Sequence, residues 1–188
     1  NVFSVDCALR RLGVEPIVTD NVEQLRRADK VVFPGVGEAS SAMAYLRSRH
    51  LDELIRSLTQ PVIGICIGQQ LLCRNSEEGN TECIGVFDTS VKRFSEAPGV
   101  KVPEMGWNAL HDLSSPLFKG VREGDYVYFV HSYYVPVSEF TIATADYTVP
   151  YAAAMHRDNF WTVQFHPEKS GKVGEQILRN FLEMEATD

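Results

Sequence analysis

The 188-residue sequence has few cysteines, no excess of basic side chains and no long apolar run. Four cysteines without a Cys-x-x-Cys pair argue against a disulfide framework and against the common zinc motifs. The 18 Lys and Arg against 25 Asp and Glu give a net charge of −7, which disfavours nucleic-acid binding by bulk charge. No run approaches the ~18 apolar residues of a membrane-spanning helix. We therefore expect no metal, no nucleic-acid or membrane partner, and a cytoplasmic location.

The remaining composition, 44% hydrophobic and 23% charged, is typical of a globular protein, and the length favours a single domain over residues 1–188. In the first half, apolar strands alternate with helices, which predicts a mostly parallel central sheet flanked by helices. The second half is β-rich. The expected strands are 15–19, 30–33, 61–65, 86–91, 126–130, 142–145, 152–155 and 162–165. The expected helices are 1–12, 40–58 with a break near residue 50, 69–72, and 172–184. The predicted fold class is α/β.

The strongest chemical signal is the segment Gly64-Ile65-Cys66-Ile67-Gly68. It follows the pattern of a nucleophile elbow, G-x-S-x-G, with cysteine in place of serine, and it lies between an apolar strand and a helix. A helix N-terminus lowers the pKa of a nearby thiol. The alternative is that Cys66 is a small buried apolar residue, which is the interpretation we prefer for the other three cysteines. The strand and helix around Cys66 favour the nucleophile.

A thiolate nucleophile needs a base, and the base needs a group that orients it. His166 ends an apolar strand and is followed by Pro167 and Glu168. Because proline keeps the segment extended, residues two apart point the same way, and Glu168 is placed to orient the imidazole of His166. His131, at the end of an aromatic strand, is the second candidate for the base, although a place in the wall of the substrate pocket suits it better.

Acyl transfer also needs an oxyanion hole. One donor is expected from the backbone amide of Ile67, directly after the nucleophile. The second is expected from the loop Pro34-Gly35-Val36-Gly37, where a strand ends and glycines free the backbone before a helix. The alternative interpretation of this loop is an ordinary turn between a strand and a helix.

Together these motifs resemble the class I, triad-type glutamine amidotransferases over nearly the whole chain. The resemblance depends on residues 34–37, on residues 64–72, and on Phe165-His166-Pro167-Glu168. Two further segments, 105–108 (Met-Gly-Trp-Asn) and 128–133 (Tyr-Phe-Val-His-Ser-Tyr), are most similar to the branch of this family that serves a cyclase in histidine biosynthesis.

The resemblance implies a role for each matching residue. Cys66 would attack the carboxamide of glutamine and form a glutamyl thioester, with His166 as base and Glu168 as its orienting group. The oxyanion hole would comprise Gly35, Val36, Gly37 and Ile67. The amino-acid end of glutamine would be held by Gln70, Glu78, His131, Ser132 and Tyr133. The partner would be contacted by Trp107, Asn108 and Lys169.

The resemblance also implies the partner and the overall reaction. The partner would be a (β/α)₈ cyclase in a heterodimer, which uses the ammonia to make imidazole glycerol phosphate and an aminoimidazole carboxamide ribotide. No cofactor is expected. The family begins with a hydrophobic strand before the helix at Asn1, so we expect such a strand upstream in the full-length protein.

Two alternatives to this interpretation stay open. One is the glutaminase of another amidotransferase, from the anthranilate, pyridoxal phosphate or purine pathway. The other is a cysteine hydrolase of a different kind, such as a peptidase.

Overall fold

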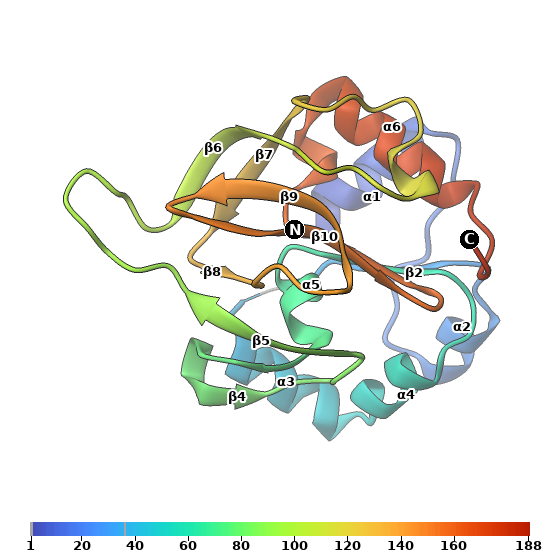
Figure 1. Cartoon of the computed structure of the whole chain (residues 1–188). Coiled ribbons are helices and arrows are strands. Elements are labelled where there is room, and N and C mark those ends of the chain that lie inside the picture. The colour runs from blue at the N-terminus through green and yellow to red at the C-terminus, as the bar shows by residue number, and fades with distance from the viewer. Residues whose placement is uncertain (1, 36) are drawn as a thin grey trace.

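The computed structural model describes residues 2–35 and 37–188 (Figure 1). Val36, one of the residues expected in the oxyanion hole, lies outside the described residues. A five-stranded sheet runs through the molecule in the order β1-β2-β11-β10-β9. Strands β1, β2 and β11 pair in parallel, and β10 and β9 continue the sheet with antiparallel pairing. The strands are β1 (Val31–Phe33), β2 (Val62–Ile65), β9 (Thr141–Tyr147), β10 (Val149–Arg157) and β11 (Phe160–Val163).

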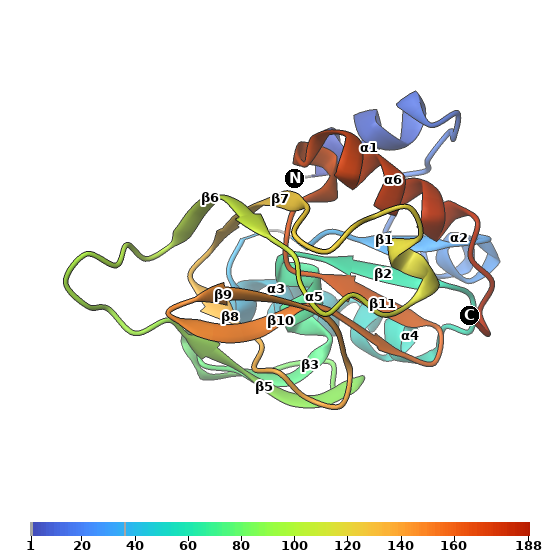
Figure 2. The same cartoon turned by 45° about the horizontal axis from the view of Figure 1, so that its top comes forward.

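Helices cover both faces of this sheet, as Figures 1 and 2 show, and the α/β prediction is confirmed. Strand β2 is buried along its whole length, so its alternate side chains enter two different cores. Ile63 and Ile65 pack with α1 and α6, whereas Val62 packs with α3, α4 and α5. The helices are α1 (Val2–Arg11), α2 (Val22–Arg27), α3 (Ala39–Ser48), α4 (Leu51–Ser57), α5 (Ile67–Leu71) and α6 (Gly171–Leu182).

The expected break inside the helix over 40–58 is confirmed at His50. This residue has a left-handed backbone, with φ of 58°, and it separates α3 from α4. None of the helices in the described ranges combines the length and the apolar character that crossing a bilayer requires.

Two smaller sheets lie beside the central one. The first has the order β4-β3-β5-β8, with β3 (Cys73–Ser76), β4 (Thr81–Glu82), β5 (Phe87–Arg93) and β8 (Tyr133–Tyr134). The second is an antiparallel pair of β6 (Glu104–Ala109) and β7 (Tyr126–His131). The described residues also form three short 3-10 helices: η1 (Glu78–Asn80), η2 (Pro116–Phe118) and η3 (Pro167–Lys169). The β6–β7 pair has one face toward the core and one toward solvent, as alternation along a strand requires.

The prediction of a strand over 15–19 is wrong. This segment takes no helix or strand structure, and Ile17 and Val18 are 73% and 68% exposed. A strand needs a neighbouring backbone to accept and donate its hydrogen bonds. No described residue pairs with this segment in a sheet. The run of β-prone residues was therefore not sufficient to define a strand.

Candidate active site

Cys66 lies on a sharp turn between β2 and α5. Its backbone has φ of 56° and ψ of −112°, a region that side chains of L-residues rarely occupy. The backbone amide of Cys66 donates to the carbonyl of Val163 at 2.8 Å, which holds the turn against β11. A Cβ on Gly68 would clash with the carbonyl oxygen of Phe33, so the elbow needs glycine to approach the end of β1. The geometry is that of a nucleophile elbow.

Gly35 brings the expected oxyanion loop onto this elbow. A Cβ at Gly35 would collide with the side chain of Ile67 and with the backbone nitrogen of Gly68. Gly35 and Gly37 both have positive φ, at 59° and 77°. The described part of the loop therefore lies against the first residues of α5, where an acyl oxygen on Cys66 would need donors.

His166 and Glu168 form a close and largely buried pair. The His166 Nδ1 lies 2.9 Å from the Glu168 Oε2, and their side chains are 11% and 1% exposed. Burial lowers the pKa of His166, but hydrogen bonds with Cys66 and with Glu168 outweigh it and raise this pKa to about 9. A base hydrogen-bonded to a thiol on one side and to a carboxylate on the other is the arrangement of a catalytic triad.

Gln164 is a residue at this site that the sequence reasoning missed. Its side chain is fully buried, and its Nε2 lies 3.7 Å from the Cys66 Sγ. Its Oε1 accepts from the Gln70 Nε2 at 2.9 Å, and the same Gln70 nitrogen donates to the Tyr133 carbonyl at 2.9 Å. Alternation could have found Gln164, because a residue two before His166 in an extended chain faces the same side.

The edge of β7 that is not paired with β6 runs along the active site. The carbonyl of Tyr128 accepts from the backbone amide of His166 at 2.9 Å. The carbonyl of Val130, two residues later on the same edge, lies 3.8 Å from the Cys66 Sγ and accepts from the thiol. One strand edge therefore contacts both the nucleophile and the base.

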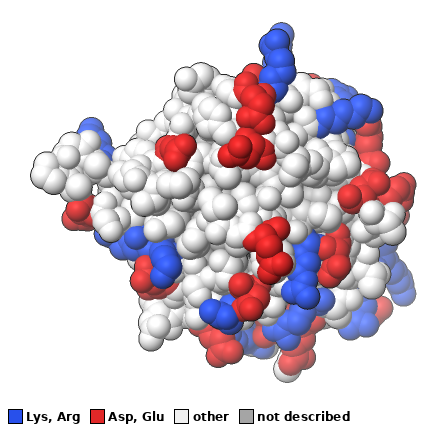
Figure 3. Space-filling model, viewed as in Figure 1, with Lys and Arg blue, Asp and Glu red and all other residues white. Residues whose placement is uncertain are grey.

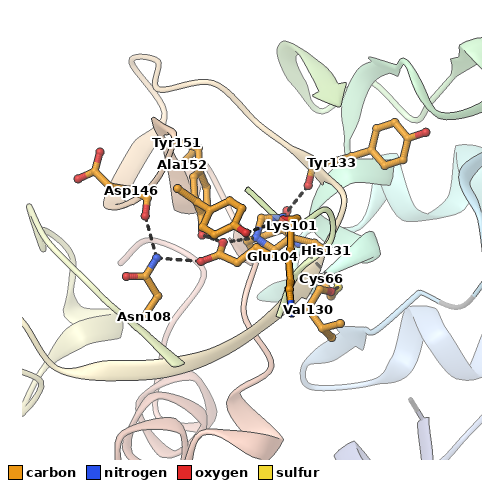
Figure 4. Close-up of polar contacts among 12 residues, drawn as sticks. Cys66, Lys101, Glu104, Asn108, Val130, His131, Tyr133, Asp146, Tyr151 and Ala152 are labelled. Carbon is orange, nitrogen blue, oxygen red and sulfur yellow. Dashed lines mark hydrogen bonds and ion pairs between the residues drawn. The ribbon is translucent and has the colours of Figure 1, made fainter. Parts of the chain in front are cut away.

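His131 lies just behind this edge and has protein partners on both ring nitrogens (Figure 4). Its Nδ1 lies 2.7 Å from the Tyr133 carbonyl, and its Nε2 lies 2.8 Å from the Glu104 Oε1. Its side chain is buried. With both nitrogens engaged, His131 does not compete with His166 for the role of base.

The other residues expected to bind glutamine are distributed around the elbow. Glu78 accepts from the backbone amide of Ala39 at 2.7 Å, so its carboxylate lies at the start of α3, just after the oxyanion loop. Burial raises the pKa of Glu78, and the hydrogen bond from Ala39 opposes that shift. The carbonyl of Ser132 accepts from the amide of Phe94 at 3.0 Å, which fixes the chain before Tyr133.

The residues expected at the partner interface do not all lie on one face. Trp107 is 56% exposed on the outer face of β6, with the Tyr128 ring 6.0 Å away from its own, so it is not a core residue. Asn108 points to the opposite face because neighbours in a strand alternate, and its amide donates to Glu104 and to the Asp146 carbonyl. Lys169 is exposed beside the triad.

Comparison with known proteins agrees with this geometry. The profile of the family described as glutamine amidotransferase class-I matches residues 2–184, so the chain belongs to that family. Among solved structures, one titled as a glutamine amidotransferase has a TM-score of 0.74 at 19% identity, with 97% of this chain and 93% of the other covered. A protein of Thermoplasma acidophilum, titled as a GMP synthase component, has a TM-score of 0.72 at 20% identity, covering 96% and 86%. These two likenesses concern the fold.

Sequence relatives define the branch of the family. The imidazole glycerol phosphate synthase subunit HisH of Bacteroides fragilis is 59% identical over 185 residues, which cover 98% of this chain and 94% of the relative. HisH of Escherichia coli O157:H7 is 47% identical over 186 residues, with the same coverage of both chains. Within the amidotransferases, the chain is therefore a member of the HisH family.

Proposed function

We propose that this chain is the glutaminase subunit of an imidazole glycerol phosphate synthase, and that Cys66, His166 and Glu168 are its catalytic triad. The observation that carries the proposal is the cysteine on a strained elbow beside a buried His–Glu pair. The 59% identity to a HisH subunit supports the pathway assignment. The expected net reaction of the subunit is hydrolysis of glutamine to glutamate and ammonia.

The site supports a thioester mechanism. His166 takes the proton of the Cys66 thiol, and the sulfur attacks the carboxamide carbon of glutamine. His166 then returns the proton to the leaving nitrogen, so that ammonia departs and a glutamyl thioester stays on Cys66. A water molecule, deprotonated by the same imidazole, cleaves the thioester to glutamate and restores the thiol. The Gln164 amide lies beside the sulfur, and the amides of Ile67 and of the 35–37 loop, Val36 included, are proposed to bind the oxyanion.

The amino-acid end of glutamine is proposed to lie among Gln70, Glu78, Ser132 and Tyr133. The carboxylate of Glu78 suits the substrate ammonium group, because a charge-assisted hydrogen bond is strong where water is displaced. The side-chain nitrogen of Gln70 is held by Gln164 and by the Tyr133 carbonyl, which leaves its oxygen free to accept. The segment 131–133 would bind glutamine through its backbone peptide groups, and not through the imidazole of His131.

The partner is proposed to be a (β/α)₈ cyclase, bound in a heterodimer over the outer face of β6 and β7. This face exposes Met105, Trp107 and Tyr126, and such aromatic and methionine side chains are enriched in protein interfaces. Figure 3 shows few charged side chains over the region of β9 and β10, whereas charges gather over β3–β5, α3 and α4. Ammonia would pass to the cyclase near Lys169. The four free cysteines are consistent with the cytoplasmic location that we propose.

Replacement of the nucleophile tests this proposal. In a complex reconstituted with the proposed cyclase subunit, Cys66→Ala should abolish glutamine-dependent formation of imidazole glycerol phosphate. Synthesis from added ammonium should continue, because the cyclase performs that step. Cys7→Ala, a substitution in α1, is the matched control and should leave both activities unchanged. Turnover of glutamine by Cys66→Ala at the wild-type rate would show that the nucleophile lies elsewhere.

A further inference from the structure

A buried polar cluster lies between β6, β7 and β10, next to the active site but outside the triad (Figure 4). Its centre is the carboxylate of Glu104, whose side chain is 5% exposed. The Glu104 Oε1 contacts the His131 Nε2 at 2.8 Å and accepts from the Tyr151 hydroxyl at 2.6 Å. The Glu104 Oε2 accepts from the Asn108 Nδ2 at 2.8 Å. A charged group at such depth persists only where it is paired and hydrogen-bonded.

Hydrogen-bond chemistry defines the direction of these contacts. The Tyr133 carbonyl only accepts, so the Nδ1 of His131 carries a hydrogen and donates to it. Burial, followed by the nearby charge of Glu104, raises the pKa of Tyr151, so its hydroxyl keeps its proton and donates. A single further proton, between the His131 Nε2 and the Glu104 Oε1, completes the cluster. Every polar atom of the Glu104–His131 pair thus has a partner.

Two backbone carbonyls connect this pair to the reacting groups. Glu104 and His131 face each other in the register of β6 and β7, so the pair joins the two strands at one end. The carbonyl that contacts the Cys66 Sγ belongs to Val130, the residue directly before His131. The carbonyl that His131 binds, that of Tyr133, also accepts from Gln70, which in turn holds Gln164 beside the sulfur.

Three aromatic rings surround the imidazole of His131 and restrict it to one position. Phe94, Phe129 and Tyr151 have ring centroids 5.1, 5.6 and 5.2 Å from that of the imidazole. Within this aromatic enclosure, the imidazole has one carboxylate and one carbonyl as partners, and a shift of the ring would break both bonds. The enclosure therefore turns the pair into a rigid joint between β6 and the end of β7.

We propose that Glu104 and His131 are positioning residues for glutamine hydrolysis, which hold the Val130 and Tyr133 carbonyls in place against Cys66 and Gln70. The proposal rests on the function proposed above. Neither residue touches substrate through its side chain. We infer that the pair acts through its hydrogen bonds rather than through a net charge, so a glutamine at position 104 that keeps the contacts with His131 and Asn108 should preserve its role. The glutamine amide nitrogen would donate to a neutral His131 Nε2, and its oxygen would accept from Asn108.

The test compares Glu104→Leu with Glu104→Gln. The leucine variant keeps volume but removes the acceptor, whereas the glutamine variant removes the charge and keeps the hydrogen bonds with His131 and Asn108, with the Tyr151 hydroxyl turned to accept from the second amide hydrogen. Two measurements are made at 25 °C on protein shown by circular dichroism to be folded. One is the kcat of glutamine hydrolysis in the cyclase complex. The other is the rate at which iodoacetamide alkylates Cys66, followed by peptide mass spectrometry. Small misplacements of reacting groups cost up to about 10²-fold in rate.

We expect Glu104→Leu to lower kcat and the alkylation rate by about tenfold or more, and Glu104→Gln to restore both to within about twofold of wild type. A purely structural role would lower thermal stability in Glu104→Leu but leave both rates unchanged in the folded protein, and that result would overturn the proposal. If Glu104→Leu does not fold, His131→Asn replaces it, because asparagine keeps a donor for Tyr133 but loses the contact with Glu104. Normal rates in folded His131→Asn would also overturn it.

The wild-type complex distinguishes the two proposals. If it fails to release ammonia from glutamine, the proposed function fails, whatever the variants do. If wild type and Glu104→Leu both hydrolyse glutamine at equal rates, the proposed function stands and the positioning role is refuted.

Discussion

At the scale of single residues, the pKa of His166 is the most informative property of this site. The raised pKa, about 9, means that the imidazole retains at neutral pH the proton that it takes from Cys66, and its contacts with Cys66 and Glu168 are responsible. Because this value exceeds the ordinary histidine value of about 6.5, the interaction stabilises the folded chain. That stabilisation is fully present below about pH 6.5 and is lost as the pH rises through about 9.

Glu168→Gln should lower the pKa of His166, since the 2.9 Å contact loses its charge while burial still disfavours the cation. NMR titration of isotope-labelled histidine measures this, with Cys66→Ala as a second variant that should also lower the pKa. Glutamine turnover by Glu168→Gln should fall but stay above that of Cys66→Ala, because removing an orienting group costs less than removing a nucleophile. An unchanged titration midpoint in both variants would contradict the triad.

At the scale of elements, η3 carries Glu168 and depends on how closely α6 approaches it. Gly174, in the first half of α6, is buried against η3, and a Cβ there would clash with the carbonyl oxygen of Pro167. This clash is with backbone, so the helix or η3 must move to relieve it. Glycine at this position is therefore a packing requirement of the site, although it lies outside every motif in the sequence.

Gly174→Ala should destabilise the fold by about 1–3 kcal/mol, the usual cost of overpacking, and should lower glutamine turnover by displacing Glu168. Urea denaturation and steady-state kinetics measure the two effects. The matched control is Lys172→Ala, an exposed substitution in the same helix, which should change neither. Full activity and stability in Gly174→Ala would show that α6 can shift away from Pro167 without displacing η3.

The sequence patterns predicted most of the helices and strands, but not how these elements pair and pack against one another. Local patterns were enough for the elbow at Cys66, for the His166–Glu168 spacing, and for the break at His50. They failed at residues 15–19, because a strand is defined by its neighbour and not by its own residues. They also missed Glu104 and Gln164. Alternation from His166 could have identified Gln164, whereas Glu104 is a lone carboxylate in a strand with no periodic signal, and only tertiary packing brings it to the site.

At the scale of the whole molecule, the outer face of β6 and β7 belongs to the strand pair whose free edge contacts the active site. Trp107 projects from this face, and on the same strand the inward side chains of Glu104 and Asn108 hold the buried cluster. A partner seated on Trp107 would thus bear on the strand pair whose free edge contacts Cys66 and His166. The proposed interface and the two carbonyls that contact Cys66 and His166 therefore belong to one small sheet.

Trp107→Ala should weaken binding of the cyclase by about tenfold or more, since large aromatic anchors dominate interface energies. Isothermal titration calorimetry of the chain with the cyclase measures this. Alkylation of Cys66 in the free chain should stay at the wild-type rate, because the triad is untouched. Tyr45→Ala, which removes a half-exposed aromatic side chain from α3, is the control. If Trp107→Ala binds the cyclase with wild-type affinity, the interface lies on another face of the molecule.

The edge of β7 also has a consequence for how this protein can vary. Its two contacts with the triad come from the carbonyls of Tyr128 and Val130, which are main-chain groups. No substitution removes a carbonyl, so the outward side chains of this strand are free to diversify with the surface of a changing partner. The alignment of sulfur and imidazole is inherited from the backbone. The same strand therefore serves the proposed recognition of the partner through its side chains and catalysis through its backbone carbonyls. Mutation can change the side chains without removing the carbonyls.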